Sequence, residues 1–266
     1  MTRVAVVGHV EWVEFIPVGR LPDPGQVVHA DGVFARAAGG GGVVAGVLAE
    51  LGAEVHFYTA LGEDAYGRSA AEQLRERGVE MHIAWRERPT RRAFTLLDDA
   101  GERTIVTIGE RLEPLGADPL DWDRLGGIAG VYFTAGDRQA LQAAREAKIL
   151  VASPRARHAL SGDGPSVDAL VFSASDRDEG EWAERGQTRA RLMVASEGAA
   201  GGHWWGNAEG RWQAAELPGP AVDSYGCGDS FAAGFTFGLA SGTTIGQAAE
   251  LGARCGARCL TRAGAP

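Results

Sequence analysis

The chain is poor in cysteine and in basic residues and has no long apolar run, and each shortage excludes a class of protein. Three cysteines among 266 residues cannot build a disulfide framework. Lysine and arginine number 26 against 35 acidic residues, and the net charge of -9 argues against nucleic acid as the main partner. No stretch has the length of a signal-peptide core or a membrane span. We therefore expect a cytoplasmic protein with neither a nucleic-acid nor a membrane partner.

The remaining composition is that of an ordinary globular protein, with 45% hydrophobic and 23% charged residues. Glycine is the exception, because its 39 residues are about twice the usual share and favour tight turns and close backbone approaches. None of the six histidines pairs with another ligand residue at a spacing typical of a metal site. Cys255 and Cys259 are one helical turn apart, which favours packing on a helix face. We therefore expect the chemistry to reside in the sequence motifs.

Short apolar runs alternate with amphipathic stretches along most of the chain. Buried strands are expected at residues 4–7, 55–58, 131–133, 149–152, 169–172 and 192–195. Helices are expected at residues 42–51, 65–77, 138–147, 176–185, 230–240 and 244–260. This alternation predicts an α/β fold in which a largely parallel sheet is covered by helices on both faces. We expect residues 1–266 to form one domain of this kind.

Two segments break the alternation. Val27–Arg36 and Met81–Ile108 contain strand-like runs, and the second includes a hairpin signal at the turn Asp98–Gly101. Neither segment supplies the crossover helix that a parallel strand needs. We therefore expect a small β-sheet beside the main one, formed roughly by residues 11–36 and 81–108. Its exposed edge offers a place for a second copy of the chain to pair, as a homodimer.

The most specific pattern spans Asp223–Asp229 and reads D-S-Y-G-C-G-D. Gly226 and Gly228 free the backbone for unusual dihedrals, so that they and Cys227 can present consecutive N–H groups to an anion at a helix start. A carboxylate beside bound phosphate has a natural task, which is to take the proton from an attacking hydroxyl. Asp229 is therefore predicted to be a general base. The alternative is a glycine-rich turn that Asp229 merely caps.

This motif resembles the D-T-x-G-A-G-D signature of the ribokinase/PfkB family of carbohydrate kinases, and a weaker match covers nearly the whole chain. The resemblance implies a ribokinase-like three-layer core with a mainly parallel sheet, and a small β-sheet lid over the acceptor. It also implies ATP-dependent phosphorylation of a hydroxymethyl group on a sugar or sugar-like molecule. Mg²⁺ would accompany the nucleotide, and a monovalent cation such as K⁺ is a further candidate ligand.

The same resemblance implies where the nucleotide binds. Asp223 and Ser224 open the signature itself. Ser196-Glu197-Gly198 is similar to the T-x-G nucleotide contact of the family, which makes Ser196 and Gly198 candidates. Gly256 lies on the last predicted helix, which would flank the adenine.

The acceptor site is implied by two further stretches. Gly39, Gly40, Gly41 and Val43 lie where the family has a G-G-x-G-A-N type motif, with Gly40 and Val43 replacing its usual lysine and asparagine. Those replacements remove polar contacts to sugar hydroxyls and argue against unmodified ribose. In the other stretch, Glu11 stands in place of a sugar-binding asparagine, and Trp12 is a candidate to stack on an acceptor ring.

Two candidates involve charge. Arg92, with Arg91 beside it, begins the predicted hairpin and is a candidate to bind a phosphate or carboxylate of the acceptor. Glu179 lies in the region of the N-x-x-E motif that organises magnesium in the family, and its spacing makes it the metal candidate. The asparagine of that motif is missing from this sequence.

Two other functions remain open. A nucleoside kinase would share the core and differ in the acceptor pocket. A degenerate member of the family would bind a ligand without turnover, although the intact Asp229 speaks against it. A dinucleotide-binding oxidoreductase is disfavoured, because bulky residues follow Gly8 where a G-x-G-x-x-G turn would stand.

Overall fold

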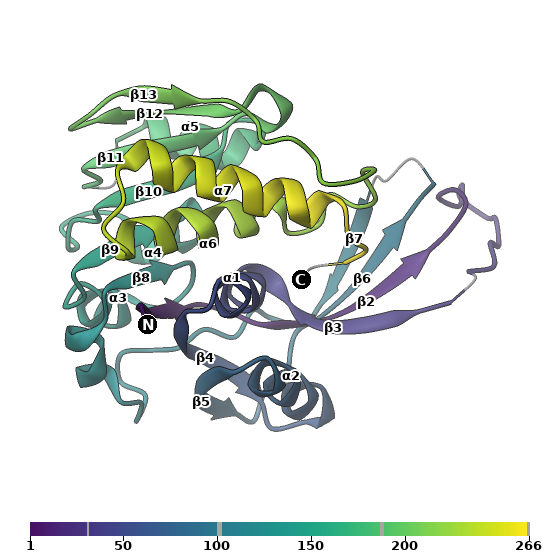
Figure 1. Ribbon diagram of the computed structural model, residues 1–266. Helices are drawn as coiled ribbons and strands as arrows, with labels where there is room; N and C mark the ends of the chain where they lie inside the picture. The colour runs from purple at the N-terminus through teal and green to yellow at the C-terminus, as the bar shows by residue number, and fades with distance from the viewer. Residues whose placement is uncertain (31, 100–102, 187–188, 265–266) are drawn as a thin grey trace.

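The computed structural model describes residues 1–30, 32–99, 103–186 and 189–264. Nine strands form the large sheet: β1 (Arg3–Val7), β4 (Glu54–Gly62), β5 (Val79–Arg86), β8 (Gly130–Phe133), β9 (Ile149–Ala152), β10 (Ala169–Ser173), β11 (Leu192–Ser196), β12 (Gly202–Gly206) and β13 (Gly210–Trp212). Their order is β13-β12-β11-β10-β9-β8-β1-β4-β5 (Figure 1). All pairs from β5 to β11 are parallel, whereas β12 and β13 add an antiparallel edge.

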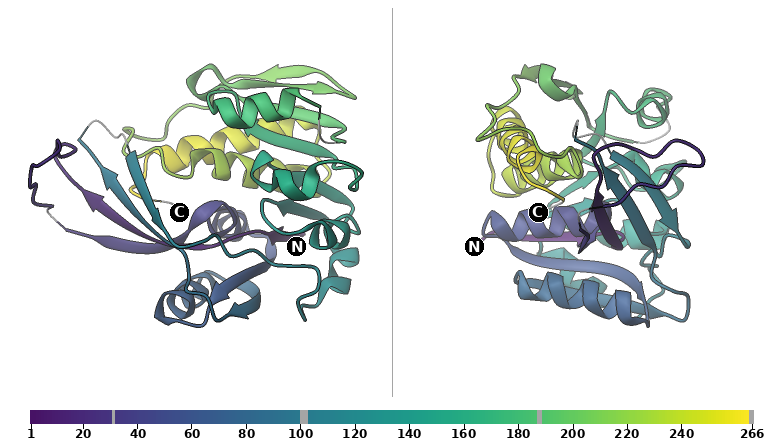
Figure 2. Two further views of the ribbon diagram at one scale, coloured as in Figure 1. Left: turned by 180° about the vertical axis from the view of Figure 1, so that it is seen from behind. Right: turned by 90° about the vertical axis from the view of Figure 1, so that its right-hand side faces the viewer.

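Helices cover both faces of this sheet, so the core has three layers (Figures 1 and 2). One face carries α1 (Gly39–Glu50), α2 (Ala65–Glu76), α6 (Cys227–Ala240) and α7 (Ile245–Leu260). The other carries α3 (Arg138–Ala144), α4 (Arg157–Leu160) and α5 (Arg177–Glu184). The expected α/β fold with a mainly parallel sheet is therefore confirmed.

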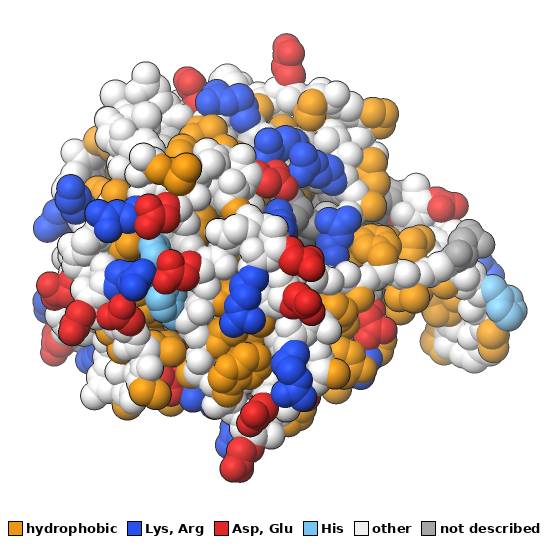
Figure 3. All heavy atoms as spheres, turned by 60° about the horizontal axis from the view of Figure 1, so that its bottom comes forward, with side chains coloured by type: hydrophobic (Ala, Val, Ile, Leu, Met, Phe, Trp, Pro, Cys, Tyr) orange, Lys and Arg blue, Asp and Glu red, His pale blue; other side chains and the backbone are white. Residues whose placement is uncertain are grey.

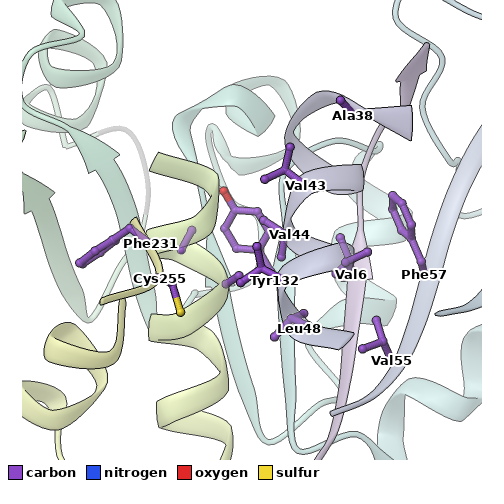
Figure 4. Packing of buried hydrophobic residues seen from close by; sticks show 14 of the residues in the cluster. Val6, Ala38, Val43, Val44, Leu48, Val55, Phe57, Tyr132, Phe231 and Cys255 are labelled. Carbon is purple, nitrogen blue, oxygen red and sulfur yellow. The ribbon is translucent and has the colours of Figure 1, made fainter. Parts of the chain in front are cut away.

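The apolar core divides along the central strand because alternate side chains of a strand point to opposite faces. Val4 and Val6 of β1 belong to the cluster beneath α1, α6 and α7. Ala5 and Val7 belong to the cluster beneath α3 and α5. Figure 4 shows part of the first cluster, in which side chains of α1, α6 and the sheet gather around Tyr132 of β8. This packing fixes the starts of α1 and α6 against the carboxyl ends of the strands.

A second, four-stranded sheet projects from one end of the core (Figures 1 and 2). Its strands are β2 (Glu11–Pro17), β3 (Phe34–Ala38), β6 (Arg92–Leu97) and β7 (Arg103–Ile108). Their order is β3-β2-β6-β7. We refer to this sheet as the lid. The turn of the β6–β7 hairpin includes residues 100–102, which lie outside the described residues.

The expected boundaries of the lid need correction at two places. Met81–Arg86 belongs to β5, which pairs in parallel with β4 in the large sheet, because α2 supplies the crossover helix between them. Within Val27–Arg36, only residues 34–36 are in a strand, and residues 27–30, 32 and 33 form an irregular, mostly exposed segment.

The surface carries charged side chains of both signs. Acidic and basic side chains are interspersed over the face drawn in Figure 3. In the described part of the chain, no helix has the length and apolar character that crossing a membrane requires.

Candidate active site

The Asp223–Asp229 motif forms a tight loop that leads directly into α6. Gly226, the residue before the helix, has φ 76° and ψ 6°, a left-handed conformation that glycine adopts without a Cβ clash. Gly228 does not have positive φ, because it already lies in the first helical turn. The unusual dihedrals expected at both glycines are therefore needed only at Gly226. No side chain caps the helix. The N–H of Cys227 donates to the carbonyl of Ser224 at 3.4 Å and the N–H of Ser230 to the carbonyl of Gly226 at 2.8 Å, so the N–H groups of Gly228 and Asp229 are the ones available to an anion.

Asp223 and Ser224 hold this loop in place. The buried carboxylate of Asp223 accepts hydrogen bonds from the backbone N–H groups of Tyr225 and Gly264, each at 2.8 Å. It thus ties the loop to the C-terminal segment. Arg103, on strand β7 of the lid, donates a hydrogen bond to Ser224 Oγ. The lid therefore contacts the loop where the nucleotide is expected.

Asp229 lies in the first turn of α6 and is 9% exposed. Arg155 connects it with a second carboxylate, since Arg155 Nη1 donates to Asp229 Oδ1 at 2.9 Å and Arg155 Nε to Glu179 Oε1 at 3.2 Å. The Asp229 carboxylate raises the pKa of the Arg155 guanidinium further above its ordinary value, and Glu179 acts in the same direction. Arg155 is therefore a permanent cation between the two acids.

These groups open into a small cavity of about 50 Å³. It is lined by Tyr132, Ser153, Arg155, Val171, Phe172, Ser173, Glu179, Ser196, Gly228, Asp229 and Ala232. Ser196 Oγ donates to the carbonyl of Phe172 at 3.3 Å, and burial raises the pKa of Glu179. A larger groove, of about 760 Å³, lies between β3, α2 and the C-terminal segment and contains none of these groups. We place the candidate active site at the smaller cavity because the reactive side chains converge there.

The glycine run at the start of α1 packs against the same groups. A Cβ on Gly40 would lie 2.9 Å from Arg155 Nη1 and 3.3 Å from Asp229 Oδ1, so only glycine fits there without a shift. Gly39 has φ 76°, and a Cβ on Gly41 would lie 2.7 Å from the carbonyl of His9. The three expected glycines therefore reach the site. The structure does not bring Val43 there, because that side chain is fully buried in the apolar core (Figure 4).

Beside Gly40, a second polar group forms at the base of the lid. His9 Nε2 accepts the N–H of Gly40 at 3.4 Å and lies 3.6 Å from Glu11 Oε1, which is 3.3 Å from Arg91 Nε. Burial lowers the pKa of His9 well below its ordinary value, and Arg111, Arg155 and Arg91 add to this shift. Burial raises the pKa of Glu11. Burial and the three arginines therefore favour the neutral form of the imidazole.

Trp12 and Arg92 lie elsewhere. The ring of Trp12 is 6.3 Å from that of Tyr66 on α2, and the Arg92 guanidinium stands 4.3 Å from the centre of the same Tyr66 ring. Strand alternation places these two residues on the opposite side of the lid from Glu11. The structure does not bring them to the Asp229 cluster.

The remaining expected residues surround the start of α6. Cys227 Sγ lies 4.0 Å from the carbonyl of Asp223, so the thiol turns back toward its own loop. A Cβ on Gly256 of α7 would lie 3.3 Å from the carbonyl oxygen of Cys227, and glycine thus allows the two helices to approach closely. Gly198 has φ 59° at the start of the short helix η3 (Gly198–Ala200) and is exposed.

The sequence matches a family of known proteins. The family model for the pfkB family carbohydrate kinases matches residues 1–160 and 167–266. The chain belongs to this family.

Three kinases to which this chain is similar act on or bind different sugars. An ATP-dependent ribose-1-phosphate kinase of Halopiger xanaduensis is 29% identical over 88% of this chain and 84% of that protein. An acarbose 7(IV)-phosphotransferase of Actinoplanes is 45% identical over 29% of this chain and 28% of that protein. The structure of Arabidopsis thaliana ribokinase complexed with ribose and ATP superposes with a TM-score of 0.79, at 19% identity over 100% of this chain and 95% of that one.

Sequence reasoning missed several residues of this candidate site, namely His9, Arg111 and Arg155. Arg155 comes three residues after the end of β9, and His9 comes two residues after the end of β1. Binding sites in parallel sheets form at the carboxyl ends of the strands. Polar residues just after each predicted strand could therefore have been grouped in advance, although their pairing with Asp229 could not.

Proposed function

We propose that this protein transfers the γ-phosphoryl group of ATP to a hydroxymethyl group of a sugar or sugar-like molecule, with Asp229 as general base. The observation that carries the proposal is the position of Asp229. Its carboxylate lies in the first turn of α6, next to N–H donors without a cap, and is hydrogen-bonded to Arg155. One side of the carboxylate thus faces a site for phosphate and the other a fixed cation.

The transfer step requires a proton acceptor near the attacking hydroxyl. We assign this role to Asp229 Oδ2, because Oδ1 is already hydrogen-bonded to Arg155. The hydroxyl proton passes to the carboxylate while the acceptor oxygen bonds to the γ-phosphorus and the bond to the ADP oxygen breaks. Arg155 stabilises the carboxylate before transfer, and the N–H groups of the α6 turn stabilise charge on the phosphoryl oxygens.

The chain fits a magnesium nucleotide as co-substrate. A Cβ on Gly228 would meet no atom within 4 Å, so there is open space above the first turn of α6 for phosphate oxygens. Mg²⁺ bound to a nucleotide is held largely by phosphates and water, and supplies charge neutralisation. Glu179 lines the cavity and is the residue we assign to its water shell. A K⁺ site stays a prediction.

We further propose that the acceptor carries an anionic group, such as the phosphate of a sugar phosphate. The guanidinium groups of Arg91, Arg111 and Arg155 act on His9 at the base of the lid, and each of them also lies within 3.3 Å of a carboxylate oxygen of the chain. Arginine binds phosphate well because its planar fork can donate two parallel hydrogen bonds. The Halopiger relative is an ATP-dependent ribose-1-phosphate kinase, which supports the same class of acceptor.

Substrate entry requires the lid to move. The cavity of about 50 Å³ is much smaller than the roughly 300–1,000 Å³ of typical ligand pockets. The contact between Arg103 and Ser224 is one of those that hold the lid against the nucleotide loop. A lid that closes over both substrates would exclude water and suppress ATP hydrolysis.

A panel of acceptors tests the proposal. The protein is incubated with MgATP and, separately, with ribose 1-phosphate, ribose, fructose 6-phosphate or adenosine, and each acceptor is analysed by mass spectrometry for an added phosphoryl group. We expect addition to a sugar phosphate, with slower ATP consumption when no acceptor is present. Addition to adenosine alone would support the nucleoside-kinase alternative. ATP binding without transfer to any acceptor of either class would support a ligand-binding role.

A further inference from the structure

Two histidines and a glutamate meet on the face of the large sheet that is covered by α3 and the 3₁₀ helix η1 (Trp122–Gly127). His56 is on β4, and Glu80 and His82 are on the neighbouring edge strand β5. In the parallel register His56 is opposite Glu80, and Tyr58 is opposite His82. The three side chains therefore share one face, within two residues of one another along the strands.

The distances within this group match those between ligands of a small divalent cation. His56 Nδ1 is 3.3 Å from His82 Nε2 and 3.4 Å from Glu80 Oε2, and His82 Nε2 is 3.5 Å from Glu80 Oε1. Ligands bound tetrahedrally at 2.0–2.1 Å from a zinc ion are about 3.3–3.4 Å apart. The atoms that would bind all lie within 4.8 Å of one another.

Neighbouring groups orient these ligands as they do in known metal sites. Glu54 Oε1 is 3.4 Å from the other ring nitrogen of His56, Nε2. A carboxylate near Nε2 favours the tautomer with its proton on Nε2 and a lone pair on Nδ1, which is the usual arrangement behind a metal-bound histidine. The ring of His82 is stacked on Tyr58, with centroids 4.3 Å apart and planes 7° apart. Both imidazoles are therefore fixed before any ion binds.

A buried imidazole and a neighbouring cation define the surroundings of the group. His56 is 2% exposed. Arg124 Nη1 donates to Glu80 Oε1 at 2.9 Å, so this cation stabilises the carboxylate and leaves Oε2 toward His56. The side chain of Glu80 is 52% exposed, which gives an ion a route from solvent.

We propose that His56 Nδ1, His82 Nε2 and Glu80 bind a divalent transition-metal ion of the Zn²⁺ type. Two imidazoles and one carboxylate suit Zn²⁺ or Co²⁺, whereas Mg²⁺ prefers oxygen ligands. The ion would link the edge strand β5 to β4 and so stabilise the edge of the sheet. His56 is near the start of β4, whereas the candidate active site lies at the carboxyl ends of the strands. The proposal is therefore independent of the proposed function.

Cobalt titration of the full chain, without a polyhistidine tag, tests the proposal. We expect one Co²⁺ per chain, with the visible absorption bands of a tetrahedral site, and displacement by Zn²⁺. His82→Gln should weaken binding by at least about ten-fold, and Glu54→Gln by about 10–100-fold. His203→Gln is the matched control, because His203 also faces a glutamate, Glu197 at 2.9 Å, and should bind Co²⁺ like the wild type.

Thermal unfolding gives a second readout that separates binding from folding. Zn²⁺ at about 100 times its Kd should raise the Tm of the wild type by about 5 °C, and at the same Zn²⁺ concentration it should raise that of Glu54→Gln by about half as much or less. Circular dichroism without metal should show the same fold for both. Equal affinity in wild type and both variants would overturn the proposal, as would a sulfur-to-cobalt charge-transfer band, which would assign the ion to cysteines.

Discussion

At the scale of single residues, Arg155 determines the charge of the candidate active site. It is hydrogen-bonded to Asp229 on α6 and Glu179 on α5, and its side chain is 40% exposed. Asp229 is nearly buried, so removing Arg155 would leave its carboxylate without a compensating charge. Arg155 thus offsets the repulsion between the carboxylates of Asp229 and Glu179 and holds both at the site.

We expect Arg155→Gln to lower phosphoryl transfer by at least about ten-fold and to destabilise the fold by about 1–2 kcal/mol, allowing for its exposure. Steady-state kinetics and urea unfolding measure the two effects. Arg157→Gln, an exposed neighbour in the same turn, is the control and should change neither. Unchanged kinetics in a folded Arg155→Gln protein would remove Arg155 from the site.

His9 gives a prediction for pH. Its pKa is lowered in the folded state from an ordinary value of 6.5, so the unfolded chain binds the proton more readily. Stability therefore falls as the pH drops below about 6.5, and the contribution of His9 is complete above that value. We expect the unfolding free energy to fall less between about pH 7 and pH 5 in His9→Gln than in the wild type. Urea unfolding at each pH measures this, with the exposed His158→Gln as control, and equal slopes in all three proteins would contradict it.

At the scale of elements, two glycines at the start of α6 have different roles, since Gly226 permits the turn and Gly228 leaves space for a ligand. Gly226 has a left-handed backbone conformation, so Gly226→Ala should lower the free energy of unfolding by about 1–2 kcal/mol, which urea unfolding measures.

Gly228 is helical and faces open space, so Gly228→Val should keep the fold stable, although its side chain would stand where phosphate oxygens are expected. Calorimetry with a non-hydrolysable ATP analogue should show weaker binding to Gly228→Val. Wild-type affinity in that variant would place the phosphates elsewhere.

The elements of the core were predictable from the sequence because their signals are local. Each expected strand and helix appears within a few residues of its predicted bounds, since apolar period and caps act over one segment. β5 was misplaced because membership of a sheet depends on the partner strand, which a local pattern does not contain. For the same reason β12 and β13, a short edge rich in tryptophan, were not expected.

The candidate site was likewise predictable only where its residues are close together in the sequence. Asp229 and the glycines were found because one motif contains the chemistry. Arg155 and His9 were not, because the loops that carry them come together only after β9, β8 and β1 are aligned in the sheet. The His56–His82 pair was missed because 26 residues of a strand–helix–strand unit separate its members. Sequence spacing identifies ligands on one element more readily than ligands on neighbouring strands.

At the scale of the whole molecule, the lid exposes an edge that other proteins usually protect. All six residues of β7 are exposed, including Ile105, Val106 and Ile108, and β7 is an edge strand of the lid sheet. An exposed apolar edge of this kind favours pairing with another strand. The expected homodimer through the lid stays a prediction on this evidence.

We expect light scattering to show a dimer for the wild type and a monomer for Val106→Arg. A charge at the centre of β7 would have to be buried in a paired edge, which is unfavourable. Val27→Arg adds the same charge on an exposed residue outside the strands and should remain dimeric. A monomeric wild type at micromolar concentration would contradict the prediction.

The central claim is that Asp229 takes the proton of the acceptor hydroxyl, and the Asp229→Asn variant tests it most directly. Asparagine keeps the size of the side chain and removes the base. With an acceptor from the panel, single-turnover transfer should slow roughly a hundred- to ten-thousand-fold. Calorimetry should show nearly unchanged affinity for the ATP analogue, because the N–H groups of α6 remain. A folded variant that keeps more than about a tenth of the wild-type rate would contradict the assignment of Asp229 as the base.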